Sequence, residues 1–313
     1  MTEKTELSIV IPAYNEQDNV IPLYGELKKV LESLGKSFEI IFVDDGSTDR
    51  TLQNIKELHE KDERVKALSF SKNFQKAAAL SAGFDNAKGR VIITMDADLQ
   101  DDSNEIPGFL AKLEQGYDLV VGWKHKRKDS FAKKIPSRIF NLLIRLFTGT
   151  RVHDCDCNFR AIREEAVKDL NIYGGLYRYI PVLVKNKGHK VGEIKVNHRP
   201  RKHGKSKYGF NRLFKGAFDL VTIKFLTSYN NRPLHLFGGL GAMMSLAGIA
   251  IGAYLSVIRL YYGEPIGGRP LLLLGVLLIL MGTQLISMGL IGEMIANTYQ
   301  RTEHKYVIRE RLE

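Results

Sequence analysis

Cysteine and tryptophan are the rarest residues of this 313-residue chain, with two cysteines and one tryptophan. Cys155 and Cys157 are separated by one residue, which argues against a disulfide framework and fits a reducing compartment. A zinc site is also disfavoured, because the two cysteines and His153 supply only three soft ligands. We therefore expect the cysteines to be small buried residues.

Glycine is missing from the turn after the first expected strand, which reads Pro12-Ala13-Tyr14-Asn15-Glu16. A dinucleotide-binding fold needs a glycine-rich turn here, so this class is disfavoured. The N-terminal residues are polar, and we expect no signal peptide. No internal repeat or low-complexity tract occurs. The length suits one substantial domain and a smaller part.

Charge is missing from two apolar stretches, residues 236–258 and 271–291. Each is long enough to cross a bilayer as a helix that rises about 1.5 Å per residue. We predict a transmembrane hairpin over residues 233–295, with helices at about 236–258 and 271–293. Two buried helices of a soluble core are the alternative.

Basic residues surround this hairpin unevenly. They are Lys215, Lys224 and Arg232 before it, Arg301, Lys305, Arg309 and Arg311 after it, and only Arg259 and Arg269 in its loop. The positive-inside rule then predicts a cytosolic domain over residues 1–232 and a cytosolic tail over 296–313, in a multi-pass protein of the plasma membrane. Glu293 is expected at the interface or paired with a neighbour.

Before the hairpin, strand and helix patterns alternate. The expected strands are 7–11, 38–43, 65–70, the run ending at Asp96, and 118–121; the expected helices are 18–34, 48–61, 75–86 and 104–114. This alternation predicts an α/β fold with a mainly parallel, doubly wound sheet.

Acidic turns follow two of the expected strands. Asp96 and Asp98 end a β-branched run, at the sheet edge where open α/β folds bind ligands. Carboxylate oxygens suit Mg²⁺ or Mn²⁺ bridging a diphosphate. The second turn reads Asp44-Asp45-Gly46-Ser47-Thr48-Asp49 and offers acceptors to a base or ribose, or a cap to the next helix.

The formal net charge of +11 is concentrated in residues 124–145 and 199–232. Nucleic acid, an anionic membrane surface and a phosphate ligand each explain such patches. Amphipathic patterns near 131–147 and 210–225 predict either core-facing helices or helices lying in the bilayer interface.

Three motifs together resemble those of family 2 glycosyltransferases with the Rossmann-like GT-A fold. They span residues 8–16 (Ser-Ile-Val-Ile-Pro-Ala-Tyr-Asn-Glu), 43–49 (Val-Asp-Asp-Gly-Ser-Thr-Asp) and 96–101 (Asp-Ala-Asp-Leu-Gln-Asp). The chain is similar to the polyprenyl-phosphate glycosyltransferases of that family, the group of dolichyl-phosphate mannose synthase and bacterial undecaprenyl-phosphate sugar transferases. The likeness covers nearly the whole chain.

This resemblance implies a set of site residues. The donor nucleotide-sugar is expected at Pro12, Tyr14, Glu16, Asp45 and Asp96, and the metal and diphosphate at Asp96, Asp98 and Gln100. Asp154 is expected to face the acceptor, with Asp156 as the alternative. Arg201, Ser206 and Lys207 match the family's phosphate-handling loop, Arg-x-x-Gly-x-Ser-Lys.

The implied function is inverting transfer of a single hexose, from UDP-glucose or GDP-mannose, to undecaprenyl or dolichyl phosphate. A divalent cation would stabilise the leaving diphosphate. The lipid phosphate is largely ionised near pH 7, so Asp154 would act as a base for the protonated fraction or position cationic groups. Membrane lipids are expected partners and nucleic acid is not, whereas a homo-oligomer is left open.

Two other functions remain. A processive polysaccharide synthase typically carries a Gln-x-x-Arg-Trp motif, and Trp123 lacks that context. A non-catalytic membrane anchor or partner protein on the same fold would have no need for Asp96 and Asp98 opposite the Arg201 loop.

Overall fold

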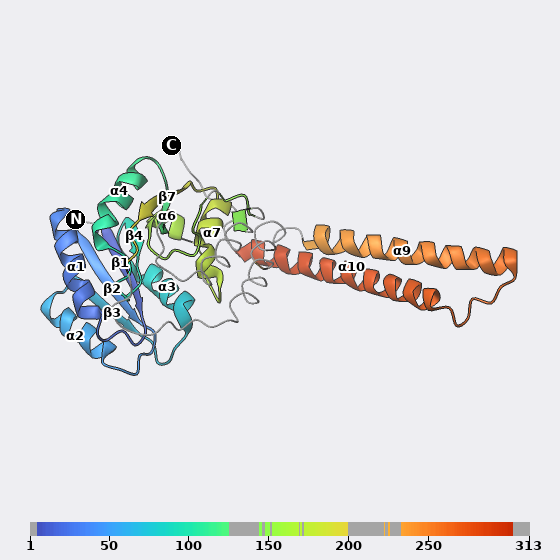
Figure 1. Cartoon of the computed structure of the whole chain (residues 1–313), viewed down its shortest axis with the longest axis horizontal. Helices are drawn as coiled ribbons and strands as arrows, with labels where there is room; N and C mark the ends of the chain where they lie inside the picture. Colours follow the sequence, from blue (N-terminus) through green and yellow to red (C-terminus); the bar gives the residue numbers. More distant parts are fainter. Residues whose placement is uncertain are drawn as a thin grey trace. The chain divides into compact units, whose positions relative to one another are not determined.

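A seven-stranded mixed sheet in the order β3-β2-β1-β4-β6-β5-β7 organises the first part of the chain in the computed structural model (Figure 1). The structure describes residues 5–124, 144–145, 148–150, 152–168, 170, 172–199, 222, 225 and 233–302, the last seven by backbone alone. The strands are β1 Leu7–Ala13, β2 Phe38–Asp44, β3 Val65–Ser69, β4 Val91–Thr94, β5 Leu119–Lys124, β6 Arg160–Arg163 and β7 Val191–Val196.

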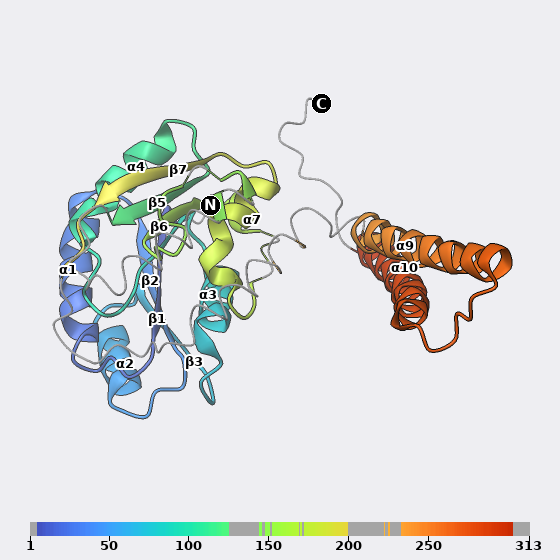
Figure 2. The same ribbon diagram turned by 45° about the vertical axis from the view of Figure 1, so that its right-hand side comes forward.

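The first four strands form the parallel part of the sheet. β1 pairs with β2 on one side and β4 on the other, with Ile9 opposite both Ile40 and Ile93. Strands β1, β2 and β4 are almost wholly buried, as expected when helices cover both faces, whereas the edge strand β3 is buried only at Val65. In Figure 2, α1 Val20–Ser33 and α2 Thr51–Lys61 lie on one side of the strands and α3 Gln75–Asn86 on the other. The predicted α/β fold is confirmed.

Strand β6 was not predicted, and it makes the sheet mixed. It runs antiparallel to both β4 and β5, with Arg160 opposite Thr94 and Val121. Because β4 and β5 each run antiparallel to β6, they run in the same direction, and their carboxyl ends lie at the same edge of the sheet. Because β6 starts at that edge, the chain just before it is carried to the carboxyl end of β4.

Short helices complete this part of the chain. They are η1 Ser103–Glu105, α4 Ile106–Glu114, α6 Glu164–Val167, η2 Leu176–Tyr179 and α7 Ile180–Asn186. Helix α2 begins at Thr51, three residues after the predicted Thr48. Thr48 lies in the preceding turn, where its backbone N–H donates to Asn15 Oδ1.

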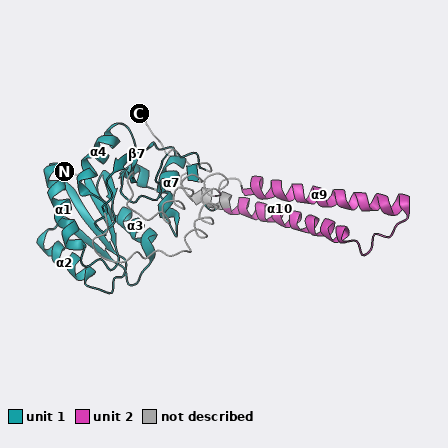
Figure 3. Cartoon of the chain, viewed as in Figure 1, with its two compact units in different colours: residues 1–223 teal, residues 224–313 magenta. Residues whose placement is uncertain are grey.

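The chain divides into two units, residues 1–223 and 224–313 (Figure 3). The second contains α9 Pro233–Tyr262 and α10 Pro270–Thr302, two helices long and apolar enough to cross a membrane. Glycines allow their close approach: a Cβ on Gly282 would lie 2.5 Å from the Gly241 carbonyl oxygen.

Glu293 has the neighbour that the sequence analysis allowed for, since its carboxylate accepts the backbone N–H of Leu234 at 3.3 Å. The predicted interface helices near 131–147 and 210–225 and the end of the tail lie outside the described residues, apart from isolated positions.

Candidate active site

The turns after β1 and β2 are joined by hydrogen bonds, so two of the sequence motifs meet at one edge. Asn15, at a positive φ of 53°, donates its N–H to Ser47 Oγ at 2.9 Å. Its side-chain oxygen accepts the Thr48 N–H at 2.8 Å. Glu16 N–H in turn donates to Thr51 Oγ1 at 2.8 Å. Pro12, Tyr14, Glu16 and Asp45 lie on these two segments.

Neutral donors hold the carboxylates of the second turn. Asp44 accepts the Ser47 N–H at 3.1 Å and the Ser69 hydroxyl at 2.9 Å. Asp45 accepts the Phe74 N–H at 2.6 Å. Burial raises the pKa of Asp45, and the adjacent Asp44 adds to the effect. This turn is therefore a rigid group of acceptors suited to a polar ligand.

Asp96 lies at the centre of a charged cluster just beyond β4. Its Oδ1 atom forms an ion pair with Lys76 of α3 and accepts a hydrogen bond from Asn158 Nδ2 at 2.8 Å. Burial opposes ionisation of Asp96, but the charges of Lys76 and Lys124 outweigh it and hold its pKa below the usual range. Asp96 is therefore a carboxylate at neutral pH.

The chain after Asp96 makes a tight, strained turn. Leu99 has a φ of 60°, which is unusual for a residue with a side chain. Gln100 donates its N–H to Asp98 Oδ1 at 3.2 Å, and Asp96 donates its N–H to Asp101 Oδ2 at 3.3 Å. The turn thereby keeps Asp96 and Asp98 in a defined relation.

Lys124, at the end of β5, supplies a second cation, which is largely buried. Its Nζ lies 3.2 Å from Asp101 Oδ1, and the two side chains are 13% and 1% exposed. Burial disfavours this ammonium, yet Asp101 and the neighbouring Asp96 and Asp154 raise its pKa above the usual value. The sequence motifs do not point to Lys76 or Lys124. Lys124 begins one of the two basic stretches of the sequence, although its side chain pairs with Asp101 of the acidic cluster.

The two candidate acceptor carboxylates differ in their surroundings. Asp154 is buried, at 2% exposure. Asp156 Oδ1 lies 3.4 Å from Arg178 Nε, and that guanidinium also lies over the ring of Tyr177. The segment carrying both is brought to Asp96 by Asn158.

Arg160 ties the same segment to η2. Its side chain is fully buried and donates to the carbonyl oxygens of Tyr177 at 2.9 Å and Cys155 at 3.0 Å. Cys155 and Cys157 are free and buried, as predicted. Burial raises the pKa of each thiol to about 12, so they remain protonated.

The acidic turn fits a divalent cation that also binds a phosphate ligand. Within the described residues, both contacts of Asp96 use Oδ1, which leaves Oδ2 for a cation. No group of three or more His, Cys, Asp or Glu side chains in that part of the chain could hold a metal alone. Mg²⁺ sites of this kind use one or two carboxylates and take their other ligands from phosphates and water.

Gln100 directs its amide elsewhere, toward His198 and the Arg199 carbonyl oxygen at 3.3 Å. Its predicted metal role stays a prediction. Arg201, Ser206 and Lys207 lie outside the described residues.

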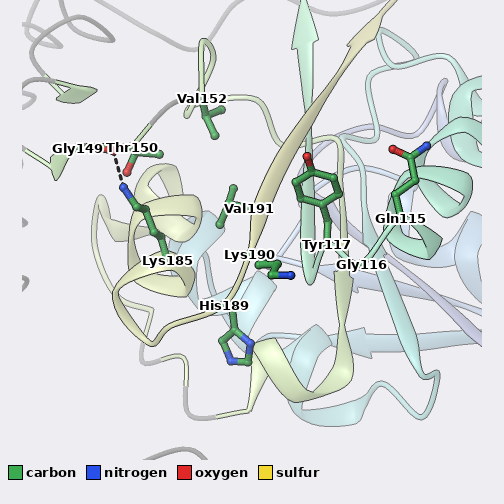
Figure 4. A pocket seen from close by; sticks show the side chains of 10 residues that line it. All are labelled: Gln115, Gly116, Tyr117, Gly149, Thr150, Val152, Lys185, His189, Lys190 and Val191. Carbon is green, nitrogen blue, oxygen red and sulfur yellow. Dashed lines mark hydrogen bonds between the residues drawn. The ribbon is translucent and has the colours of Figure 1, made fainter. Parts of the chain in front are cut away.

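A pocket of about 600 Å³ lies away from this cluster (Figure 4). It opens near the amino ends of β5 and β7, where Tyr117, Lys190 and Val191 line it, whereas Asp96 lies beyond the carboxyl end of β4. Lys185 reaches the Gly149 carbonyl oxygen across one side. None of the predicted site residues that the structure describes lines this pocket.

Comparisons with known proteins agree with this geometry. The model of the family described as Glycosyl transferase family 2 matches residues 8–170. Dodecaprenyl-phosphate galacturonate synthase of Rhizobium johnstonii is 39% identical over 98% of this chain and 93% of its own. Undecaprenyl-phosphate 4-deoxy-4-formamido-L-arabinose transferase of Pseudomonas paraeruginosa is 38% identical over 94% of this chain and 86% of its own.

Among solved structures, glucosyl-3-phosphoglycerate synthase from Mycobacterium tuberculosis, in complex with Mn²⁺, UDP and phosphoglyceric acid, aligns with a TM-score of 0.53. It covers 71% of this chain and 78% of that chain at 16% identity. At this identity the likeness concerns the fold, which is the GT-A fold.

Proposed function

The chain belongs to glycosyl transferase family 2, and we propose that it is a membrane enzyme that moves one sugar from a nucleotide to a polyprenyl phosphate. Transfer to polyprenyl phosphate is supported by the two relatives, which are named for such reactions and match nearly the whole chain. The observation that carries the proposal is the Asp96 cluster, where a carboxylate turn and two lysines meet at the carboxyl edge of the sheet.

The proposed donor site combines the two acidic turns. The turn containing Asp45 would receive the base or ribose through its rigid acceptors. Asp96 and Asp98 would hold Mg²⁺ or Mn²⁺ on the diphosphate. When bound, that cation supplies positive charge to the leaving group. Lys76, already beside Asp96, would bind a phosphate oxygen of the same donor.

We propose Asp154 rather than Asp156 as the carboxylate that faces the acceptor. Asp154 is buried, and its charge is among those that raise the pKa of Lys124 beside Asp96, whereas Asp156 pairs with Arg178 of η2. A lipid monophosphate is largely ionised at pH 7 and needs little deprotonation. Asp154 would therefore accept a proton from the protonated fraction or hold neighbouring cations in place. The Arg201, Ser206 and Lys207 motif supplies the chemistry for binding the acceptor phosphate.

The donor sugar is the least defined part of the proposal. The resemblance led us to expect UDP-glucose or GDP-mannose, but the names of the two relatives contain galacturonate and 4-deoxy-4-formamido-L-arabinose. We therefore place nucleotide-linked forms of those two sugars first. The proposed location is the cytosolic face of the plasma membrane, with α9 and α10 as the anchor.

A transfer assay tests the proposed reaction. Full-length protein in detergent receives undecaprenyl phosphate, Mn²⁺ and one labelled donor at a time: the UDP-linked forms of galacturonate, 4-deoxy-4-formamido-L-arabinose and glucose, and GDP-mannose. Label that enters the organic phase as a single-sugar lipid supports the proposal and identifies the sugar. A polymeric product would favour a processive synthase, and no transfer with any donor would favour a non-catalytic partner protein.

A further inference from the structure

The chain leaving β7 pairs with the turn that carries Asp96 and Asp98. His198 forms an antiparallel bridge with Asp101. Arg199 then donates its N–H to the Gln100 carbonyl oxygen at 2.9 Å, and Gln100 Nε2 donates to the Arg199 carbonyl oxygen at 3.3 Å. A short two-stranded contact therefore fixes the outer side of the acidic turn.

The side chain of Arg199 fastens this contact to the rest of the sheet edge. Its Nη1 donates to Glu26 Oε2 of α1 and its Nη2 donates to Asp102 Oδ1, both at 2.7 Å. The Arg199 side chain is 28% exposed. Burial works against its charge, but Glu26 and Asp102 raise the pKa of Arg199 above the usual value. Nearby, Asn197 Nδ2 donates to Glu105 at 2.9 Å.

The turn needs such support because its backbone is strained. A non-glycine residue in the left-handed region, as Leu99 is, is unfavourable and persists only where its surroundings impose it. Asp96 and Asp98 can share one cation only if this turn holds its shape. Residues that orient metal ligands without touching the metal commonly change affinity by about 10- to 100-fold.

We propose that Arg199 is a positioning residue, which holds the 98–102 turn in its cation-binding shape by linking it to α1 and to the end of β7. This inference rests on the proposed donor site. The role is distinct from that of Asp96 and Asp98, because Arg199 acts through Gln100 and Asp102.

Arg64 offers a matched control. Its Nη2 lies 3.0 Å from Glu32 Oε1 and 2.7 Å from Asp62 Oδ2, so it too bridges two carboxylates. It precedes β3, at the opposite edge of the sheet from the acidic turns. Removing either arginine breaks the same number of ion pairs, but only Arg199 touches the turn with Asp96 and Asp98.

The test compares Arg199→Ala, Arg199→Lys and Arg64→Ala in the full-length protein. Amide hydrogen exchange over residues 96–104 reports on the turn without any ligand. Titration calorimetry with UDP, in the presence of Mn²⁺ and after its removal, reports on the cation-dependent site. Melting temperatures show whether each variant is folded.

We expect Arg199→Ala to speed exchange in this segment and to weaken Mn²⁺-dependent UDP binding by about tenfold or more. Arg199→Lys keeps one of the two ion pairs and should lose less. Arg64→Ala should match the unmodified protein in both measurements. Equal results for Arg199→Ala and Arg64→Ala would overturn the inference. If the unmodified protein binds no UDP, the proposed donor site fails instead, and the exchange data still decide whether Arg199 holds the turn.

Discussion

The two acidic turns at the site hold their carboxylates in different ways. After β2, Asp44 and Asp45 accept hydrogen bonds from neutral backbone and hydroxyl groups. After β4, Asp96 and Asp101 are paired with Lys76 and Lys124. The pKa shifts have opposite signs, since burial raises the pKa of Asp45, whereas the lysines hold that of Asp96 below its usual range despite burial.

This difference suits different tasks. Carboxylates held by neutral donors keep a fixed geometry, as the recognition of a base or ribose requires. A carboxylate held by a lysine can exchange that partner for a metal ion, while the lysine turns to a phosphate. The turn after β4 thus suits a site that binds a charged diphosphate with its cation and releases the nucleotide after transfer.

The largest effect should follow loss of the buried lysine. Lys124→Met leaves Asp101, which is 1% exposed, without its cation. Removing one partner of a buried ion pair typically costs about 3–5 kcal/mol. At about 2–4 °C per kcal/mol, the melting temperature should fall by roughly 6–20 °C. Adding Asp101→Asn should recover part of the loss, and a double variant as unstable as the sum of the singles would contradict the pairing.

The second prediction compares the loss of activity when either of the two candidate acceptor carboxylates is replaced. Asp154→Asn should lower kcat by about a hundredfold, as removal of a general base or charge-positioning group does. Asp156→Asn should cost clearly less, because Asp154 acts on Lys124 in the Asp96 cluster, whereas Asp156 pairs with Arg178. Initial rates of transfer to polyprenyl phosphate measure both. A larger loss for Asp156→Asn would reverse the assignment.

The third prediction concerns the turn after β2, whose backbone conformation depends on glycine. Gly46 has a φ of 69°, and a Cβ there would lie 2.4 Å from the Lys72 carbonyl carbon. Gly46→Ala should therefore raise the KM for the donor several-fold and cost about 1–3 kcal/mol of stability. Gly35→Ala is the control, because Gly35 has a φ of 62° but no atom within 4 Å of its added Cβ. An unchanged donor KM in Gly46→Ala would contradict the placement of the base or ribose.

The smallest effects concern pH. Because the pKa of Asp45 is raised, its ionisation opposes folding above about pH 4, and Asp45→Asn should gain melting temperature relative to the unmodified protein between about pH 4 and 7. The pKa shift of Asp62 has the opposite sign, because hydrogen bonds from Arg64 hold its pKa well below the usual range. Asp62→Asn should lose stability at pH 7, and this loss should begin to shrink once the pH falls below the ordinary aspartate pKa of about 4. Melting curves across pH 3–7 measure both, and like signs would contradict the comparison.

The sequence predicted the parallel part of the fold closely. Every expected strand and helix up to the end of β5 is present within three residues of its predicted bounds. Alternating buried runs with acidic turns carry this information locally. Strand β6 was not predicted, because its four residues, Arg160–Arg163, show no clear alternation of apolar and polar side chains. Its pairing depends on β4 and β5, which are distant in the sequence.

The site was predicted in part. The motif residues on the β1, β2 and β4 turns do lie at one edge, whereas their cations were not foreseen. Lys76 lies on an alanine-rich helix twenty residues before Asp96, and only the packing of α3 on the sheet reveals their ion pair. Lys124 and Arg199 begin the two basic stretches, yet both are bound to carboxylates of the site edge. Composition alone cannot show which lysines and arginines point inward.

Sugar transfer that depends on a cation held at Asp96 is tested most directly by following label into the lipid phase. The assay compares the unmodified protein, Asp96→Asn and the exposed control Asp85→Asn, before and after EDTA and after Mn²⁺ is restored. We predict that the unmodified protein and Asp85→Asn transfer sugar equally, stop with EDTA and recover with Mn²⁺, while Asp96→Asn is slower by about 10²–10³-fold. Full activity of Asp96→Asn, or transfer that EDTA leaves unchanged, would contradict the proposed site.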